Sequence, residues 1–155
     1  MVEMRRKEKA MSDPSEIESM IKKSFVCRLA MCDGHQPYLV PLCFGYKDRV
    51  LYFHSAKAGR KLDILKKNNR VCFEFDTFPE LVKKGQDGCD WGMKFQSVIG
   101  FGQVEMLEDE AAKRKALNVI MGQYGDGHFH YDDAKVKITT VFCVRIEEMT
   151  GKRSG

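Results

Sequence analysis

The residues best suited to chemistry lie between Tyr52 and Leu65, where the sequence reads Tyr-Phe-His-Ser-Ala-Lys-Ala-Gly-Arg-Lys-Leu-Asp-Ile-Leu. The apolar run Val50–Phe53 predicts a buried strand, and the apolar spacing that begins at Leu62 predicts a helix that ends at the pair Asn68-Asn69. The polar and small residues between these two elements include Ser55, Lys57, Gly59, Arg60 and Lys61. Three cations therefore surround the first turn of a helix, where the macrodipole is already positive and each misplaced charge costs about 0.3–1 kcal/mol.

A bound anion would resolve this electrostatic conflict. Free backbone N–H groups at the start of a helix, a serine hydroxyl and converging Lys and Arg side chains together make a cradle for a phosphate group. We therefore predict a phosphate site at this turn. The alternative is a basic turn that is exposed to solvent and holds no ligand.

Composition narrows the class of protein. The chain has 155 residues, of which 43% are hydrophobic, and this suggests one domain with a substantial core. The net charge is only +4, with 26 Lys and Arg interleaved with 22 Asp and Glu, so we expect no nucleic-acid partner. We also expect no membrane association, because no stretch approaches the roughly 18 apolar residues of a membrane helix. Met1–Ala10 lacks the apolar segment of a signal peptide, which leads us to expect a cytoplasmic protein.

The chain has six cysteines and no Cys-x-x-Cys pair, so we expect free thiols in a reducing compartment. Four of them fall inside strand-like runs and are expected to be buried as small hydrophobic side chains. These four are Cys27, Cys43, Cys72 and Cys143.

Apolar alternation predicts a mainly β (α+β) protein with mostly antiparallel strands, which favours a barrel or a sandwich. The predicted strands are Phe25–Cys32, Gln36–Tyr46, Val50–Phe53, Val71–Phe75, Met93–Leu107 and Ile138–Ile146. The predicted helices cover residues 14–23, 62–67 and 110–124. We expect residues 1–155 to form a single domain, with residues 1–12 and 150–155 as extended arms, of which the tail Thr150–Gly155 has nothing to bury.

Glycine and proline positions refine this prediction. Pro41 cannot donate to a ladder, so its strand should lie at an edge or be bulged. Gly100 and Gly102 indicate a bend within their strand. The stretch Phe78–Gly92, which holds the only tryptophan, Trp91, is predicted to be a long irregular loop.

Several motifs together resemble the 5-nitroimidazole-resistance (Nim) family of the pyridoxamine-5′-phosphate-oxidase-like, flavin-binding split barrels. The most specific is Tyr52-Phe-His-Ser-Ala-Lys-x-Gly-x-Lys-Leu-Asp. The others, in the family's order, are Met4-Arg5-Arg6-Lys7, Tyr38-Leu-Val-Pro-Leu, Phe95-Gln-Ser-Val-Ile-Gly-Phe-Gly and Met149-Thr-Gly-Lys. The resemblance implies a six-stranded antiparallel split β-barrel with two to three flanking helices, and a homodimer that holds FMN, or alternatively FAD, between its subunits.

The resemblance also implies where the flavin binds. Its phosphate would lie at Ser55, Gly59, Arg60 and Lys61, with His54 beside it. Backbone groups of Val40, Pro41 and Leu42 would face the isoalloxazine edge, although the pattern alone would place these residues in the core. Phe95, Gln96, Ser97 and Val98 would reach the phosphate and ribityl chain from the partner subunit, although an ordinary half-exposed strand would look the same.

His54 is the one candidate for chemistry, because a histidine near neutral pKa beside a flavin can protonate a reduced substrate. The resemblance therefore implies an oxidoreductase that passes electrons from NAD(P)H to a small acceptor such as a nitroaromatic. A non-catalytic flavin- or haem-binding protein is the alternative, with His54, His128 or His130 as iron ligands. The pair His128-Phe129-His130 lacks identifiable further ligands, so we predict no metal site. Oxidation of pyridoxamine phosphate is disfavoured, because little chain beyond Ile146 is available for a second phosphate pocket.

Overall fold

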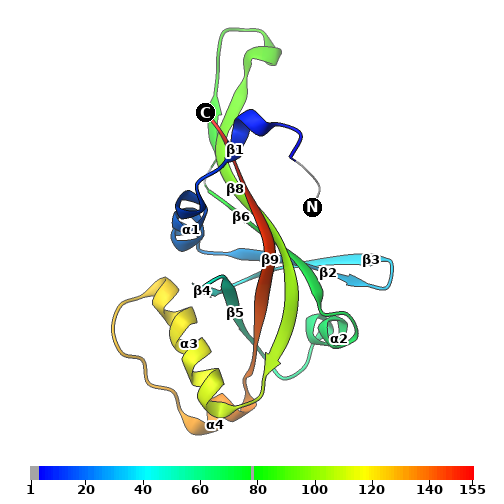
Figure 1. Cartoon of the computed structure of the whole chain (residues 1–155), viewed down its shortest axis with the longest axis vertical. Helices are drawn as coiled ribbons and strands as arrows, with labels where there is room; N and C mark the ends of the chain where they lie inside the picture. Colours follow the sequence, from blue (N-terminus) through cyan, green and yellow to red (C-terminus); the bar gives the residue numbers. More distant parts are fainter. Residues whose placement is uncertain (1–3, 78) are drawn as a thin grey trace.

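The computed structural model describes residues 4–77 and 79–155. In these residues nine strands pair antiparallel in the order β3-β2-β6-β8-β9-β5-β4, with β1 beside β9 and β7 beside β8 (Figure 1). The strands are β1 (Ala10–Met11), β2 (Cys27–Asp33), β3 (Gln36–Leu42), β4 (Gly45–Lys47), β5 (Val50–Ser55), β6 (Arg70–Asp76), β7 (Glu80–Val82), β8 (Gly92–Leu107) and β9 (Thr140–Ser154). The helices are α1 (Pro14–Lys23), α2 (Arg60–Lys67), α3 (Glu110–Tyr124) and α4 (Asp133–Ile138), with short 3-10 turns η1 (Lys7–Lys9) and η2 (Gly88–Asp90).

The sheet curls around one apolar core but does not close, because β3 and β4 stand at its two edges. Aromatic rings fill much of the interior: Phe53 stacks on Phe142 at 5.2 Å between ring centroids, and Phe44 lies 4.8 Å from Phe75. This confirms the mainly β, antiparallel split barrel that the sequence predicts. The number of strands is larger than the predicted six, because short strands flank the long ones.

Helix α1 begins where the sequence predicts. The Asp13 carboxylate accepts a hydrogen bond from the Ser15 N–H at 2.8 Å, and Pro14 occupies the first helical position. The apolar stripe Ile17, Met20 and Ile21 is buried against the sheet.

The long strands β8 and β9 bend together at the predicted glycines, where their register shifts between Phe101 and Gly102. A Cβ on Gly100 would lie 2.2 Å from the Phe73 ring, and one on Gly102 would lie 2.3 Å from the Arg145 carbonyl oxygen. No side chain fits in either place, so these glycines let two strands and the core approach closely.

The prediction of a free C-terminal tail is wrong. Strand β9 continues to Ser154 and pairs with β8, and its last residues also pair with Ala10 and Met11. The alternation of buried and exposed residues at the end of β9 is hard to see in the sequence, because the buried position is a glycine. A Cβ on Gly151 would lie 2.9 Å from the side chains of both Ile17 and Met11.

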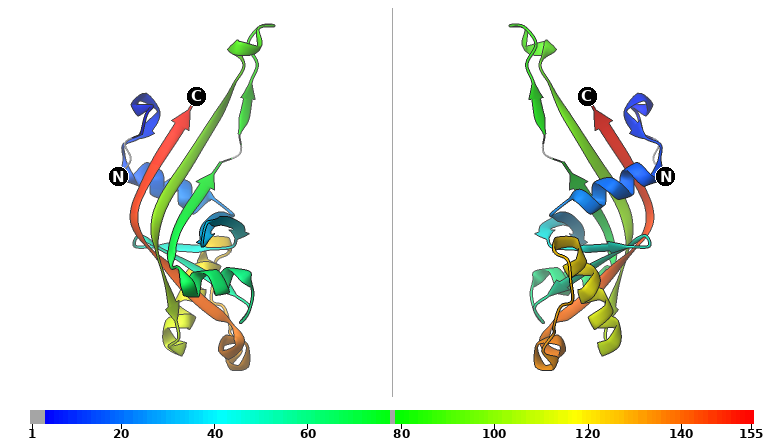
Figure 2. Two further views of the ribbon diagram at one scale, coloured as in Figure 1. Left: turned by 90° about the vertical axis from the view of Figure 1, so that its right-hand side faces the viewer. Right: turned by 90° about the vertical axis from the view of Figure 1, so that its left-hand side faces the viewer.

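The predicted irregular loop is also largely wrong, although Phe78 lies outside the described residues. Glu80–Val82 pairs with Gly92–Lys94, so β7 and the start of β8 form a hairpin, here called the arm (residues 80–94). The arm projects away from the body of the molecule (Figure 2).

Two further predictions need correction. The predicted strand Gln36–Tyr46 divides into β3 and β4, and Cys43, which lies between them, is exposed rather than buried. Asp132 caps the short helix α4, which delays the start of β9 to Thr140. Of the other cysteines expected in the core, Cys27 and Cys143 are buried and Cys72 is half-buried, and all six are free thiols.

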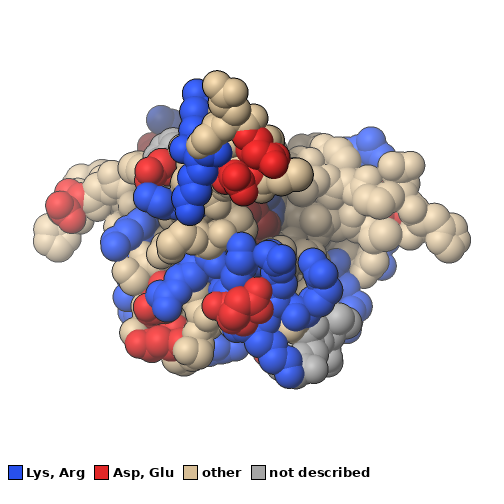
Figure 3. Space-filling view, turned by 90° about the horizontal axis from the view of Figure 1, so that it is seen from above, with Lys and Arg blue, Asp and Glu red and all other residues tan. Residues whose placement is uncertain are grey.

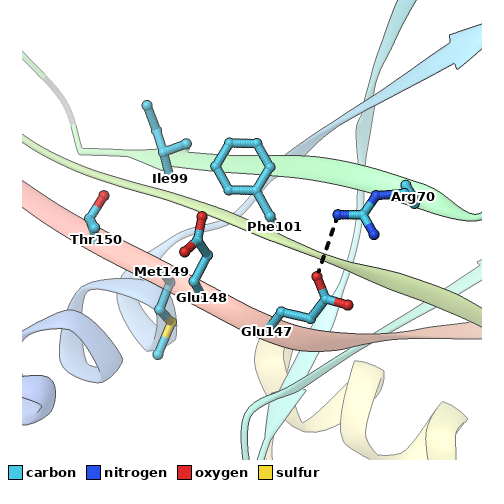
Figure 4. Close-up of a pocket in the computed structure, with 7 residues that line it drawn as sticks. All are labelled: Arg70, Ile99, Phe101, Glu147, Glu148, Met149 and Thr150. Carbon is cyan, nitrogen blue, oxygen red and sulfur yellow. Dashed lines mark ion pairs between the residues drawn. The ribbon is translucent and has the colours of Figure 1, made fainter. Parts of the chain in front are cut away.

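The outward side of the sheet is open around Leu39, Ile99 and Phe101, and this open part is here called the outer face; at Gly45, on the same side of the sheet, α3 packs against β4. Its β8 row contains Ile99 and Phe101, which are 44% and 45% exposed. These side chains point to the same side as Glu148 and Thr150, and they border a cavity of about 460 Å³ that also contains the Arg70–Glu147 ion pair (Figure 4). Apolar side chains of this size on an open sheet are typical of an interaction surface.

Candidate functional site

The turn between β5 and α2 has the features of an anion site. Gly59 has φ +145° and precedes the helix without a side-chain cap in the described residues. The N–H groups of Leu62 and Asp63 bond the Gly59 carbonyl oxygen at 2.9 and 3.2 Å. The N–H groups at positions 60 and 61 come before these bonds begin, as at any helix start, so they can point toward a ligand.

Arg60 connects this turn to the edge of the sheet. Its guanidinium carbon lies 4.6 Å from the centre of the Tyr38 ring on β3, and its Nη2 lies 3.9 Å from the Asp33 carboxylate. Both side chains of the ion pair are substantially exposed, so the ion pair itself stabilises little. The contact with Tyr38 matters more for the site, because it brings the predicted phosphate turn and the predicted ring-binding strand together within one subunit.

His54 and Lys61 are electrostatic neighbours at the end of β5. Partial burial lowers the pKa of His54, and the positive charge of Lys61 lowers it further. Burial also lowers the pKa of Lys61. The protonated forms of His54 and Lys61 are therefore both disfavoured here, and a bound anion would stabilise their positive charges.

This pair gives a pH-dependent prediction. The ordinary pKa of histidine is about 6.5. Because the folded state lowers the pKa of His54, the unfolded chain binds this proton more readily, and folded stability falls as the pH drops through about 6.5. Replacement Lys61→Ala is expected to move the pKa of His54 back up toward its ordinary value, which NMR titration of the imidazole would measure.

The matched control is Lys66→Ala, which removes the same charge from the exposed last turn of α2. It should leave the His54 titration where it is. An unchanged His54 pKa in Lys61→Ala would contradict the proximity of the two groups.

The predicted ring-binding strand is accessible along its backbone. β3 is the edge strand of the sheet, as Pro41 led us to expect, and pairs only with β2 in the described residues. The side chains of Val40 and Leu42 are half-buried against the core, while Pro41 is exposed. The strand can therefore offer backbone carbonyl groups to a ligand whose ring lies along its free edge.

The third predicted segment lies elsewhere in the molecule. Phe95–Val98 pairs with Gly151–Ser154 at one end of β9, whereas His54 and Ser55 pair with Val141 and Thr140 at the other end. One subunit therefore does not bring these segments together. The side chain of Val98 is fully buried, so only its backbone could contact a ligand.

Lys and Arg side chains crowd the end of the molecule where both termini lie (Figure 3). Acidic or polar partners offset several of them. Arg153 lies 3.1 Å from Glu16, Arg6 lies 3.8 Å from Glu8, and Lys9 donates to the Ser154 hydroxyl at 2.8 Å. Lys152 lies over the Phe95 ring at 5.7 Å. This end is therefore basic, and several of its positive charges already have a partner within the same subunit.

The remaining chemical candidates do not form a site in the described residues. His128 and His130 are exposed in the connection between α3 and α4. No group of three or more His, Cys, Asp or Glu side chains with the geometry to hold a metal occurs in residues 4–77 and 79–155. The same residues include no helix with the length and apolar character needed to cross a bilayer.

The structure shows one group of solvent-exposed residues that the sequence analysis did not predict. Phe25 is two residues before Cys27, so in a continuous strand both side chains would share the buried face. In the structure Phe25 lies before β2 begins and is 67% exposed. It lines a groove together with Val26 and Arg28. No sequence signal distinguishes this phenylalanine from a core residue, because its exposure depends on where α1 ends.

Comparison with known proteins places this geometry in a family. The sequence matches the family described as pyridoxamine 5′-phosphate oxidase over residues 13–153. A crystal structure of a candidate 5-nitroimidazole antibiotic resistance protein from Bacteroides thetaiotaomicron has 36% identity and a TM-score of 0.85, covering 93% of this chain and 86% of that chain. No curated protein matches the sequence.

More distant structures share the fold. An FAD-binding protein from Mesorhizobium loti has 26% identity and a TM-score of 0.66, covering 92% of this chain and 96% of that chain. A flavocytochrome from Azotobacter vinelandii has 20% identity and a TM-score of 0.86, covering 99% of this chain and 72% of that chain. The open antiparallel barrel, the basic β5–α2 turn and the family match over residues 13–153 lead to one conclusion: this chain belongs to the pyridoxamine 5′-phosphate oxidase-like family of split barrels, and it is similar within that family to the 5-nitroimidazole-resistance proteins.

Proposed function

We propose that this protein is a homodimeric FMN-binding oxidoreductase that passes electrons from NAD(P)H to a small acceptor such as a nitroaromatic. The observation that carries the proposal is the uncapped start of α2, where Lys61 lies beside His54 and Arg60 reaches Tyr38 on the free edge strand β3. A ligand with a phosphate at one end and a flat ring with polar edges at the other matches these two features. The flavin would carry the redox chemistry, while the protein binds and orients it.

The residues present fit such a ligand. The N–H groups at the start of α2, the Ser55 hydroxyl and the Lys61 ammonium would hold the phosphate. The backbone of Val40–Leu42 would pair with the polar edge of the ring. His54, which lies beside Lys61, would hold or donate the proton that a reduced acceptor needs. His54→Ala should then keep its affinity for FMN and lose turnover of the acceptor.

The test of the proposal is a titration of the purified protein with FMN and with riboflavin, which lacks the phosphate, followed by visible absorption. FMN should bind more tightly than riboflavin, and FAD is compared in the same way. If none of the three binds, the proposed function is wrong. A Soret band in the protein as purified would favour the alternative, a haem-binding protein, since two fold relatives are described as a flavocytochrome and as an FAD- and haem-binding protein.

The outer face supports the dimer. Phe95–Val98 lie far along β9 from the β5–α2 turn of the same subunit, so they can contribute to a flavin site only across an interface. The exposed apolar side chains of Ile99, Phe101 and Leu39 would be covered in a symmetric pair of subunits.

Phe101→Lys is expected to convert the dimer to a monomer, because the ammonium group would be buried at the interface without a partner. Light scattering with in-line size-exclusion chromatography would measure the mass. Ile138→Lys is the control, because Ile138 is 59% exposed on α4 and does not line the cavity that Ile99 and Phe101 border, so its replacement should leave the mass unchanged. A parent protein that is already monomeric would refute the proposed assembly.

A further inference from the structure

A groove of about 590 Å³ lies between helix α3 and the outward side of β5 and β9. Its volume falls in the range of small-molecule sites. Helix α3 packs on β4 and β5 along this side of the sheet (Figure 1), and at Gly45 a Cβ would lie only 2.5 Å from the Ile120 nitrogen. The helix residues that line the groove include the small side chains of Ala112 and Ala116. Where these small side chains face the strands, space remains between the helix and the sheet.

The strand register places two rows of side chains on the floor of this groove. Residues that pair across a ladder share a face of the sheet. In the first row Val50 pairs with Lys47 on one side and with Arg145 on the other. In the second row Tyr52 pairs with Cys143. All five side chains line the groove, so its floor is apolar and aromatic with a cation at each end of one row.

The charges around the groove are not balanced. The Arg145 Nε donates to the Glu105 carboxylate at 2.7 Å, so this guanidinium already has a counterion. The ammonium groups of Lys47 and Lys115 form no ion pair or hydrogen bond within the described residues. Of those residues, Asp48 supplies the one carboxylate that lines the groove. Two ammonium groups and one carboxylate leave one positive charge, which matches a ligand with a single negative charge.

Tyr52 adds a hydrogen-bond donor. Its hydroxyl forms no hydrogen bond within residues 4–77 and 79–155, and burial raises the pKa of Tyr52, so the phenol stays protonated at neutral pH. The charges of Arg145 and Asp48 act on this phenol, which places it near the charged end of the groove. Lys47 is a diagonal neighbour of Tyr52 across the β4–β5 ladder, within reach of a long side chain. A hydroxyl donor beside an ammonium group suits a carboxylate.

We propose that this groove binds an aliphatic monocarboxylate, with Lys47 and Tyr52 holding the carboxylate and the hydrocarbon chain lying between α3 and the sheet. The aliphatic side chains of Val50, Leu107 and Val119 line the groove and would contact the chain. A neutral ligand would leave the positive charge without a partner, and a ligand with two negative charges would be repelled by Asp48. The site shares no residue with the proposed flavin site, so the inference goes beyond the proposed function and does not depend on it.

The test is an NMR titration of the purified protein with octanoate and with octanamide, which has the same chain and no charge. Octanoate should bind and shift the backbone amide signals of Val50, Tyr52 and Val119. Octanamide should bind about fivefold more weakly, because it cannot pair with an ammonium group. Equal affinities for the two probes, or octanoate shifts that leave these three residues unaffected, would overturn the proposal.

A variant that fills the groove tests its location. Ala112→Leu should raise the Kd for octanoate by about tenfold or more, because the longer side chain occupies the space for the hydrocarbon chain. Ala111→Leu is the matched control, since Ala111 is the preceding residue of the same helix, is exposed and does not line the groove. Its octanoate affinity should equal that of the parent. If Ala112→Leu also binds like the parent, octanoate lies elsewhere and the proposal is wrong.

Lys47→Ala keeps the proposal testable if Ala112→Leu fails to fold, because Lys47 is exposed and its replacement leaves the core unchanged. It should raise the Kd for octanoate about two- to fivefold and leave the affinity for octanamide unchanged. Lys66→Ala removes the same charge from α2 and should change neither affinity. An equal loss in both variants would contradict a contact with Lys47. None of these titrations needs flavin, so a failure to bind FMN would refute the proposed function without deciding this one.

Discussion

Lys61→Ala is expected to weaken FMN binding by about ten- to a hundredfold and to leave riboflavin binding nearly unchanged. A hydrogen bond to a charged group contributes about 1.5–3 kcal/mol, which corresponds to that range of Kd. Lys61 stands at the second position of α2, where its charge adds to that of the helix start and where burial already lowers its pKa. Isothermal titration calorimetry with both ligands would measure the two affinities at one ionic strength.

Lys66→Ala serves as the control, since it removes one positive charge from the far end of the same helix. An equal loss of FMN affinity in both variants would mean that FMN binding depends on the net charge of the protein and not on a contact with Lys61. If neither variant loses affinity, the β5–α2 turn is the solvent-exposed basic turn that the sequence left as an alternative.

Gly45→Ala is expected to destabilise the fold by about 3 kcal/mol or more, at the upper end of what overpacking usually costs. A Cβ at this position would lie 2.5 Å from the Ile120 nitrogen and 2.6 Å from the Val119 carbonyl carbon, both in the backbone of α3. A helix backbone cannot turn aside as a flexible side chain can, so α3 would have to move away from β4. Urea unfolding followed by circular dichroism would measure the change in the free energy of unfolding.

Gly122→Ala, in the same helix α3, is expected to change the free energy of unfolding in the opposite direction. Nothing lies within 4 Å of a Cβ at this position, so the change should stabilise the protein by about 0.5–1 kcal/mol through the backbone entropy of the unfolded chain. An unfolding midpoint for Gly45→Ala that equals that of the parent would show that α3 does not pack on β4 as described.

The parts of the molecule that could be predicted from the sequence are those with local signals. The Asp13-Pro14 start of α1 depends on neighbouring residues, and so does the strand–turn–helix from Val50 to Lys67. The bend at Gly100 and Gly102 was also predictable, because glycine inside an apolar strand usually marks a bulge or a close approach of the backbone.

The parts that could not be predicted depend on distant contacts. Gly151 is buried only because α1 packs over it, so the end of β9 reads as a polar tail. Cys43 is exposed where the chain passes from β3 to β4, and the neighbouring Phe44 N–H donates to the hydroxyl of Tyr124, which belongs to a helix about eighty residues later. The separation of Phe95–Val98 from His54 becomes visible only when β9 is followed along its full length.

The edge strand β3 has a consequence for self-association. Pro37 and Pro41 lie four residues apart, so both nitrogens face the same side of the strand, and prolines are tolerated where that side is the free edge. This edge therefore presents carbonyl oxygens, but it lacks N–H donors at the two proline positions. Another strand needs an unbroken alternation of donors and acceptors to add itself to a sheet, whereas a ring N–H needs a single acceptor. The same two prolines thus leave the edge available to a small heterocycle while protecting the protein without its ligand from edge-to-edge aggregation into fibres.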